Sequence, residues 1–454
     1  MTKMKDYDVV VIGGSAAGIP AAITAKRHYP DKSVLLIRRE NKVLIPCGIP
    51  YIFGTVGSPD KDIIPDKVLE NNGIKLLIDP AVHINNKKRI VETKAGEQVH
   101  YRKLVLATGS EPMIPPIPGI DKGNIFSIKK NISYLNGMIK AMEHASNLVI
   151  VGCGFIGVEL AEECKKKNKN LNITIVEMMK HCLQLVYDKS FCLKAEETLI
   201  NQGINLMVDE KVESFAGNDK VEAIKLKSGK EIKADMVILG IGAVSNIELA
   251  QEIGLEIGSA RGIIVNRYMQ TSDPNIFACG DCTEKVSFFD GKSSALKLAS
   301  IATMEARIAG ANLFASSRLN MGVIGVFSTT LGDSAFAAAG LTEGQARKQG
   351  YNIIVGESEA INRHPGGMPG AENLKVKLVF EAGTQIILGG QICGAKSGGE
   401  LINAISAFIH QRMTANDIAT FQLGTHPALT ASPISYQLVN AAEIAIKQLK
   451  IKRG

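Results

Sequence analysis

The segment NLVIVGCGFIGVELAEECKKK, residues 147–167, decides the fold of this chain. Its apolar run ends in the turn Gly152-Cys153-Gly154-Phe155-Ile156-Gly157, which is the pattern of a strand, a glycine-rich turn and a helix. The glycines permit a tight turn and a close approach of the backbone to a pyrophosphate, which then lies at the helix N-terminus. The segment therefore predicts a Rossmann-like domain that binds a dinucleotide.

An acidic residue follows this turn at the distance that such a domain requires. Glu177 comes directly after the next apolar run, NITIV at 172–176, and lies about 20 residues beyond Gly157. A carboxylate at this position accepts hydrogen bonds from the adenosine ribose and repels a 2′-phosphate. We therefore expect the second cofactor to be NADH, with NADPH less favoured.

The same pattern of strand, turn and helix occurs near the N-terminus, in DVVVIGGSAAGIPAAITAKRH at 8–28. Its turn runs from Gly13 to Gly18 and has Ser15 at the middle glycine position, where serine is still small enough to admit a pyrophosphate. The strand that follows ends without a carboxylate, and the candidates there for contact with the nucleotide are Arg38 and Glu40. Strands that alternate with helices in this way predict an α/β protein with two Rossmann-like domains.

Two further segments point to a flavin on the first turn. LVLATGS at 104–110 is an apolar strand that ends in the small residues Ala107, Thr108 and Gly109. TSDPNIFACGDC at 271–282 places Asp281 after another strand and a glycine, where a carboxylate can hold a ribityl hydroxyl. From about residue 325 the pattern changes to strands separated by glycine-containing turns and followed by a helix, which predicts a third, α+β domain.

Composition excludes several other classes of protein. The chain has 454 residues, a net charge of +7 and clusters of lysine that are typical of solvated surfaces, so we expect no nucleic acid partner. We find no signal peptide and no apolar run long enough to span a membrane. Eight cysteines in so long a chain do not form a dense disulfide framework, and we expect a cytoplasmic protein with mostly free, buried thiols and no metal site.

The motifs IGGSAAG, LATGS, VGCGFIG with Glu159, LGIGAVSN with Gly242, and NIFACGD occur in the order found in the two-dinucleotide flavoprotein disulfide reductases. The chain resembles this family over nearly its whole length. The resemblance implies FAD on the 13–18 turn and Asp281, NADH on the 152–157 turn, and Phe155 as a gate to the nicotinamide pocket. It also implies a homodimer with a shared active site. The expected domains are an FAD domain (1–112 and 247–322), an NADH domain (113–246) and a dimerisation domain (323–454).

A single cysteine, Cys47, lies in VLIPCGIPY and has no second cysteine at short spacing. It resembles the redox cysteine in the branch that contains CoA-disulfide reductase, NADH oxidase and NADH peroxidase. We expect a helix to start directly after Cys47, with its positive end stabilising a thiolate. The redox forms of Cys47 are then a mixed disulfide, a persulfide or a sulfenate. Three other cysteines give weaker signals: Cys279 and Cys282, in CGDC, are interpreted as part of the flavin site, and Cys153 as a small spacer.

The electron acceptor is less well defined by the sequence. Ala16 and Ala17 lie where NADH peroxidases carry a histidine, and the absence of that histidine favours a sulfur acceptor. Val43 and Pro46 replace the residues that precede the cysteine in CoA-disulfide reductases, which argues against CoA disulfide as that acceptor. His426, in GTHPALT, resembles a histidine that reaches the partner subunit's active site in related reductases, and could return a proton during disulfide exchange. His364, in NRHPGG, is a weaker candidate.

The leading hypothesis is an NADH-dependent, FAD-containing reductase of a small disulfide, persulfide or polysulfide, in which Cys47 carries the sulfur and His426 the proton. The first alternative is an NADH oxidase that reduces oxygen to peroxide or water. The second is an electron-entry module that serves a protein partner.

Overall fold

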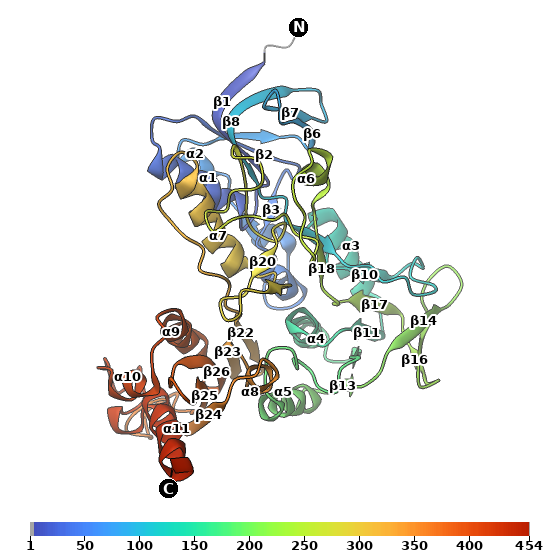
Figure 1. The fold of residues 1–454 in the computed structure, drawn as a ribbon. Helices are drawn as coiled ribbons and strands as arrows, with labels where there is room; N and C mark the ends of the chain where they lie inside the picture. The colour runs from blue at the N-terminus through green and yellow to red at the C-terminus, as the bar shows by residue number, and fades with distance from the viewer. Residues whose placement is uncertain (1–3, 454) are drawn as a thin grey trace. The chain divides into compact units, whose positions relative to one another are not determined.

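The computed structural model describes residues 4–453 and divides them into two compact units, each of which draws on separate stretches of the chain (Figure 1). Unit 1 contains the chain up to Pro116, together with Phe126–His144 and Ile241–Val323. Unit 2 contains Ile117–Ile125, Ala145–Gly240 and the chain from Ile324. The first boundary falls within the proline-rich stretch PPIPGI at 115–120.

Unit 1 is built on a seven-stranded sheet of order β5-β2-β1-β8-β7-β6, with β19 also paired to β8. Its strands are β1 (Lys5–Ile12), β2 (Val34–Arg38), β5 (Lys75–Ile78), β6 (Ala81–Asn85), β7 (Ile90–Thr93), β8 (Gln98–Leu106) and β19 (Ile276–Ala278). Strands β5, β2, β1, β8 and β19 run parallel, while β6 and β7 form an antiparallel extension. The four residues that end β1 are all buried, as a parallel strand covered on both faces requires.

Helices cover both faces of this sheet. On one face α1 (Gly18–His28) and α7 (Ala299–Asn312) pack against each other and share a hydrophobic core with β1 and β2. On the other face the core includes residues from α6 (Glu248–Glu252). The remaining elements of unit 1 are β3 (Val43–Leu44), the 3-10 helices Pro46–Phe53 and Pro59–Lys61, β4 (Ile63–Ile64), α2 (Lys67–Glu70), β9 (Ser110–Pro112), α3 (Ile132–Glu143), β18 (Ala243–Ser245), β20 (Lys285–Val286) and β21 (Ser293–Ser294).

Unit 2 contains the strands β17, β11, β12 and β13 of a second sheet, which pair in parallel in that order; the sheet is completed by β10, whose first residue alone belongs to unit 2. The strands of this sheet are β10 (Ile125–Ser127), β11 (Asn147–Val151), β12 (Asn172–Val176), β13 (Ile204–Met207) and β17 (Met236–Leu239). Helix α4 (Phe155–Lys167) follows β11, and α5 (Lys189–Asn201) precedes β13. A small antiparallel sheet of β14 (Val212–Ala216), β15 (Ala223–Leu226) and β16 (Glu231–Lys233) contributes to one core with the parallel sheet.

The C-terminal part of unit 2 is an antiparallel sheet of order β22-β23-β26-β25-β24. Its strands are β22 (Val326–Leu331), β23 (Ser334–Gly340), β24 (Ile353–Ile361), β25 (Asn373–Glu381) and β26 (Ile387–Gly394). Helix α9 (Gly398–His410) packs on β23 and β26, while α11 (Gln437–Arg453) packs on β24 and β25 (Figure 1). The shorter helices are α8 (Glu343–Lys348), α10 (Ala415–Thr420) and the 3-10 helix Pro433–Ser435.

The predicted fold class is confirmed, because two Rossmann-like sheets precede an α+β domain. Within residues 4–453, none of the helices has the length and apolar character that crossing a membrane requires.

Candidate active site

The first glycine-rich turn lies where β1 ends, next to the end of β8. Gly13 has a φ of +117°, and a Cβ there would lie 2.1 Å from the Ala107 carbonyl oxygen. A Cβ on Gly18 would lie 1.8 Å from the carbonyl oxygen of Gly13. Because neither position tolerates a side chain, α1 starts directly against the strand and its N-terminal amides lie at the turn. This is the cradle that a pyrophosphate requires.

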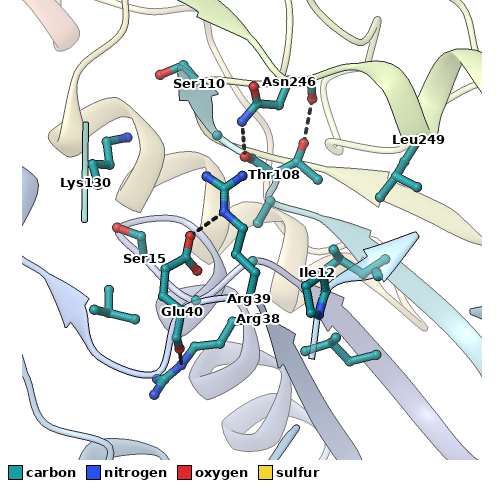
Figure 2. A pocket seen from close by; sticks show the side chains of 18 of the residues that line it. Ile12, Ser15, Arg38, Arg39, Glu40, Thr108, Ser110, Lys130, Asn246 and Leu249 are labelled. Atoms are coloured by element: carbon teal, nitrogen blue, oxygen red, sulfur yellow. Dashed lines mark hydrogen bonds and ion pairs between the residues drawn. The ribbon is translucent and has the colours of Figure 1, made fainter. Parts of the chain in front are cut away.

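A pocket of about 510 Å³ opens at this turn within unit 1 (Figure 2). It brings together most of the residues expected to bind FAD, namely Gly13, Ser15, Arg38, Glu40, Ala107, Thr108 and Gly109. Asp281 is adjacent, because its carboxylate accepts a hydrogen bond of 2.8 Å from Ser110, which lines the pocket. The size of the pocket and the missing Cβ atoms around the turn fit the nucleotide end of a flavin cofactor.

The two arginines after β2 have different surroundings. The Arg38 side chain is 1% exposed and donates two hydrogen bonds, of 2.6 and 2.8 Å, to the Asp66 carboxylate. It also donates to the carbonyl oxygens of Glu40 and Asn41, so its guanidinium anchors the β2–β3 connection. Arg39 is paired with the carboxylates of Glu40 and Glu111. Since four of the five N–H donors of Arg38 bond to protein oxygens, its role as a direct ligand of FAD stays a prediction.

Some residues of the pocket were not identified from the sequence. Lys130 lines the pocket and lies in the segment before α3. Asn246 also lines it: its side-chain amide donates a hydrogen bond to the Thr108 carbonyl oxygen, and its own carbonyl oxygen accepts one from the Thr108 hydroxyl, just after β8. Asn246 falls in the motif LGIGAVSN, so its position had a sequence signal. Lys130 belongs to a segment that carries no motif.

The second glycine-rich turn connects β11 to α4 in unit 2. Gly152 has a φ of +103°, and a Cβ on Gly157 would lie 2.0 Å from its carbonyl oxygen. The space around Gly154 is open, because among residues 4–453 no heavy atom beyond its own chain neighbours lies within 4 Å of its ideal Cβ position. Ile156 is 37% exposed at the start of the helix. The turn therefore has the room and the free helix N-terminus that a second dinucleotide needs.

Glu177 lies directly beside this turn. One oxygen of its carboxylate accepts a hydrogen bond of 2.7 Å from the Cys153 amide, and the other accepts one of 2.8 Å from the Met179 amide. Each carboxylate oxygen can accept a second hydrogen bond. Gly242, the remaining residue predicted to bind NADH, lies in unit 1, where its carbonyl accepts from Met113.

Cys153 is not the small spacer that the sequence suggested, and that interpretation was wrong. It forms a disulfide with Cys182, a residue 29 positions further along the chain in the loop after β12. The other six cysteines are thiols.

The Phe155 ring, expected to gate a nicotinamide pocket, is packed among aromatic side chains at the start of α4. It stacks on Phe327 of β22 with a centroid separation of 5.3 Å and an interplanar angle of 8°. It also meets Tyr187 edge to face at 6.2 Å. A gate in this position has to leave the Phe327 ring in order to open.

Cys47 lies in unit 1 and is exposed. The expected helix is a 3-10 helix that begins at Pro46, two residues before the expected start, so Cys47 lies within its first turn and not before it. The buried Asp62 carboxyl lies against the following residue, because a Cβ on Gly48 would be 1.9 Å from its Oδ1. Within residues 4–453 the Asp62 Oδ2 has no hydrogen-bond partner, and burial raises the pKa of this carboxyl to about 6. No sequence pattern had pointed to Asp62.

The cysteines of CGDC are both fully buried, and burial raises the pKa of each thiol. The Cys282 thiol donates to the carbonyl oxygens of Leu106 and Cys279. These contacts favour a structural role in holding β19 beside β8.

The two candidate histidines lie on loops that contact each other in unit 2. The His364 Nδ1 is 3.0 Å from the Thr430 carbonyl oxygen, and the His364 amide donates to Pro427. His426 is exposed, and its Nδ1 accepts a hydrogen bond of 3.2 Å from the Ala428 amide. An Nδ1 that accepts leaves the proton of a neutral imidazole on Nε2. Cys47 belongs to unit 1 and His426 to unit 2, so their meeting in one active site stays a prediction.

Each of the two Rossmann-like sheets has a glycine-rich turn, and the first turn borders a pocket that is lined by the residues expected to bind FAD. This combination defines an oxidoreductase that couples a flavin to a nicotinamide nucleotide. The chain belongs to the pyridine nucleotide-disulphide oxidoreductase family. The model of that family matches residues 7–306, and the model of its dimerisation domain matches residues 326–434. The chain is therefore an NAD(P)H-dependent flavoprotein oxidoreductase, with FAD and a nicotinamide nucleotide as cofactors, and its C-terminal domain supports a homodimer.

Relatives of known activity match nearly the whole chain. An NADH oxidase from Methanocaldococcus jannaschii is 32% identical over 98% of this chain and 99% of its own length. An NAD(P)H sulfur oxidoreductase (CoA-dependent) from Pyrococcus furiosus is 32% identical over 93% of this chain and 96% of its own length. The solved structure of an NAD-dependent persulfide reductase from A. fulgidus is similar at a TM-score of 0.90 and 28% identity, covering 98% of this chain and 84% of that one.

Proposed function

We propose that this protein is an NADH-dependent reductase of small disulfides, persulfides or polysulfides, with Cys47 as its redox-active sulfur. The observation that carries the proposal is the exposure of Cys47 in the first turn of a helix. Burial raises the pKa of the Cys164, Cys192 and Cys393 thiols to about 12, 12 and 11, which disfavours their thiolates at neutral pH. The sulfur-reducing relatives support the choice of acceptor.

The cofactors are held by the two glycine-rich turns. The 13–18 turn and Asp281 hold FAD, and the 152–157 turn with Glu177 holds NADH in preference to NADPH. FAD, when bound, supplies the two-electron carrier between the nicotinamide and sulfur. We place the enzyme in the cytoplasm, which is supported by six of the eight cysteines being thiols.

Cys47 and His426 carry out the sulfur chemistry. The Cys47 thiolate attacks one sulfur of the acceptor R–S–S–R′, so that a Cys47–S–S–R bond forms, the S–S bond of the acceptor breaks, and R′S⁻ leaves with the electron pair. The Nε2–H of His426 from the partner subunit passes to R′S⁻ while the Nδ1 of the same ring takes up a proton from solvent, so that the imidazole stays neutral and one solvent proton is consumed. Two electrons from NADH and one proton then cleave the mixed disulfide and release RSH. The sum is one acceptor, one NADH and one proton converted to RSH, R′SH and NAD⁺.

An anaerobic assay of NADH oxidation tests this proposal. Wild type, Cys47→Ser and the control Cys393→Ser are compared with CoA disulfide, with inorganic polysulfide and without an acceptor. We expect a sulfur acceptor to support turnover in wild type and in the control, and at least about 100-fold less turnover in Cys47→Ser, as for loss of a nucleophile. No turnover with either acceptor, or equal turnover in Cys47→Ser, contradicts the proposal.

A second candidate function is the reduction of oxygen, which the NADH oxidase relative favours. Aerobic NADH consumption that persists in Cys47→Ser, without sulfur-dependent turnover in wild type, is the result that identifies an oxidase. Turnover that requires an added protein fraction instead identifies an electron-entry module.

A further inference from the structure

The Cys153–Cys182 disulfide lies inside the proposed dinucleotide site of unit 2. Cys153 is the second residue of the glycine-rich turn, and Cys182 belongs to the loop that follows β12 and Glu177. Both side chains are buried, with exposures of 1% and 0%. In a Rossmann-like domain the turn approaches the pyrophosphate, while the end of the second strand approaches the adenosine ribose. The disulfide therefore joins the segment that faces the pyrophosphate of ADP-ribose to the segment that faces its adenosine ribose.

Hydrogen bonds connect the same two segments on both sides of the disulfide. The Cys153 amide donates to the Glu177 carboxylate at 2.7 Å, and the Cys153 carbonyl accepts from the Leu183 amide at 2.9 Å. Glu177 also accepts from Met179 at 2.8 Å, so its carboxylate is held from the turn and from the loop. The orientation of this carboxylate consequently depends on how the loop sits against the turn.

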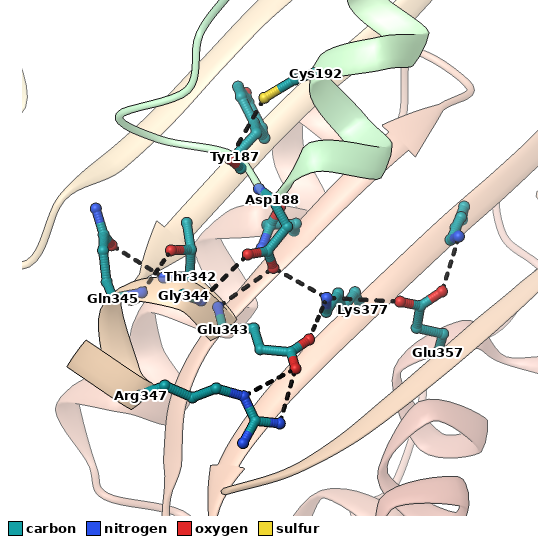
Figure 3. Close-up of polar contacts among 12 residues, drawn as sticks. Tyr187, Asp188, Cys192, Thr342, Glu343, Gly344, Gln345, Arg347, Glu357 and Lys377 are labelled. Atoms are coloured by element: carbon teal, nitrogen blue, oxygen red, sulfur yellow. Dashed lines mark hydrogen bonds and ion pairs between the residues drawn. The ribbon is translucent and has the colours of Figure 1, made fainter. Parts of the chain in front are cut away.

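The loop has a further constraint at each side of Cys182. The Cys182 amide donates to the Glu196 carboxylate of α5 at 2.9 Å, and Leu183 adopts a φ of +58°, which a residue with a branched side chain rarely adopts. At the end of the loop, Asp188 exchanges hydrogen bonds with Gln391 and pairs with Lys377 (Figure 3). A covalent bond at Cys182 fixes the middle of a segment whose far end is already anchored.

We propose that the Cys153–Cys182 disulfide is a positioning element of the dinucleotide site, holding the 178–183 loop and the Glu177 carboxylate in place for the ADP-ribose half of the nicotinamide cofactor. The inference rests on the proposed NADH site. Without the disulfide the loop has to be ordered when the cofactor binds, and that ordering weakens binding. The effect is confined to ligands that contain adenosine, because the nicotinamide half does not reach Glu177 or the loop after β12 in this fold.

The presence of the disulfide in solution is tested by counting thiols. The FAD-loaded enzyme is denatured in iodoacetamide without reductant and its mass is measured. We expect six alkylated cysteines, with Cys153 and Cys182 linked in the peptide map. Alkylation of all eight cysteines overturns the proposal.

The positioning role is tested by calorimetric titration of the FAD-loaded enzyme with ADP-ribose. The variants are Cys153→Ala, Cys182→Ala and the double variant, with Cys164→Ala as the matched control because Cys164 is a buried thiol of the neighbouring α4. We expect ADP-ribose affinity to fall about 10-fold in the first three and to stay unchanged in the control. Unchanged affinity in the double variant, or an equal loss in Cys164→Ala, overturns the proposal. Should the double variant not fold, the near-isosteric Cys182→Ser takes its place.

A structural disulfide that only stabilises the fold gives a different result. It lowers the melting temperature of the variants without changing their ADP-ribose affinity. Two further readouts separate the roles: the KM for NADH rises while kcat is retained, and turnover with reduced nicotinamide mononucleotide, which lacks adenosine, is unaffected. A rise in KM for both nucleotides overturns the proposal.

Failure of this inference is distinguishable from failure of the proposed function. ADP-ribose binding involves neither Cys47 nor an acceptor, so a negative sulfur assay leaves the titration interpretable. If wild-type enzyme does not bind ADP-ribose, the assignment of the 152–157 turn falls and the inference falls with it.

Discussion

Glu177 is a carboxylate that holds two backbone segments together and that we propose also selects the cofactor. Its two oxygens accept hydrogen bonds from the Cys153 and Met179 amides, and each still has a lone pair for a ribose hydroxyl. We expect the same carboxylate to oppose the 2′-phosphate of NADPH.

We therefore expect Glu177→Ser to raise the KM for NADH by about 10- to 100-fold, the loss of roughly 1.5–3 kcal/mol in charge-assisted hydrogen bonds. We expect the ratio of kcat/KM for NADH to kcat/KM for NADPH to fall at the same time. Steady-state kinetics with both nucleotides measures the change, and Glu231→Ser, an exposed carboxylate of β16, is the control. An unaltered preference in Glu177→Ser contradicts the assignment.

Glu159 is a carboxyl that titrates near neutral pH. It lies on α4 and accepts a hydrogen bond of 2.8 Å from Thr329, and burial, aided by Glu162 and Glu163, raises its pKa to about 7. Because its pKa is raised in the folded state, the native protein binds this proton more tightly than the unfolded chain does. Its contribution to stability is complete below about pH 4.5 and is lost as the pH rises through 7.

The variant Glu159→Gln has no carboxyl at this position, so its stability does not fall as the pH rises through 7 for this reason. We expect its free energy of unfolding, relative to wild type, to increase by about 1–3 kcal/mol between pH 5 and pH 8. Urea unfolding at the two pH values measures it, and Glu197→Gln, whose side chain is 57% exposed, is expected to show no such trend. A constant difference between Glu159→Gln and wild type would refute the prediction.

At the scale of single residues, the sequence was informative where spacing carries the chemistry. The interval between Gly157 and Glu177 predicted a carboxylate beside the turn, and the structure has it hydrogen-bonded there. Cys153 was misread because its partner lies 29 residues away in a loop with no regular spacing. Asp62 could not be found, because its contact with Gly48 depends on the pairing of β3 with β4 and not on a pattern.

At the scale of elements, α1 and α7 of unit 1 can approach closely because of one glycine. A Cβ on Gly310 of α7 would lie 2.5 Å from the carbonyl oxygen of Ala21 and 3.0 Å from the amide nitrogen of Ala25, both in α1. Since α1 begins at the FAD-type turn, the packing of α7 supports the position of that turn.

Gly310→Ala is expected to destabilise unit 1 by about 1–3 kcal/mol through overpacking, and to lower the FAD content of the purified enzyme. Gly137→Ala is the matched control, because Gly137 lies in α3 and, in the part of the chain that the structure describes, no heavy atom beyond its chain neighbours and its own helix backbone lies within 4 Å of its ideal Cβ position. There the same substitution stabilises by up to about 1 kcal/mol. Thermal unfolding and the flavin absorbance ratio measure both effects, and similar values for the two variants would argue against the packing explanation.

Elements with strong hydrophobic patterns could be predicted from the sequence. The run NITIV coincides with β12 at Asn172–Val176, and the apolar run SVLLI at 33–37, which follows the first glycine-rich turn and its helix, lies within one residue of β2. The segment after Cys47 was less predictable. Pro46 starts its helix and Pro50 lies inside it, so an amide is missing from the hydrogen-bonding pattern and the segment is a 3-10 helix.

At the scale of the whole molecule, a buried lysine connects the two parts of unit 2, the Rossmann-like domain and the C-terminal domain. Lys377 of β25 is 6% exposed and pairs with Asp188 at 3.0 Å, Glu343 at 2.8 Å and Glu357 at 3.7 Å (Figure 3). Asp188 precedes α5, while Glu343 and Glu357 belong to α8 and β24, so the network joins four elements from distant parts of the chain.

Lys377→Met leaves three carboxylates together without their cation. We expect a loss of about 3–5 kcal/mol in the unfolding free energy of unit 2, as is usual when one partner of a buried ion pair is removed. Lys375→Met, which removes a partly exposed lysine paired with Glu357, should cost less than about 1 kcal/mol. Urea denaturation followed by circular dichroism measures the unfolding free energy of both variants. Equal losses would show that the ion pairs of Lys377 stabilise unit 2 no more than the exposed pair of Lys375 does.

The order of the strands in unit 1 has a consequence for how the protein is made. Strand β8 lies between β1 and β7 and is also paired with β19, which contains Ile276–Ala278. During synthesis β19 leaves the ribosome about 170 residues after β8, a delay of roughly 10 to 35 seconds at ordinary translation rates. Until then the nascent chain lacks Asp281 and α7, so we expect the flavin to be loaded only after well over half of the polypeptide has emerged. We expect slow translation or a shortage of flavin in the cell to lower the yield of folded enzyme before any effect on its catalysis is seen.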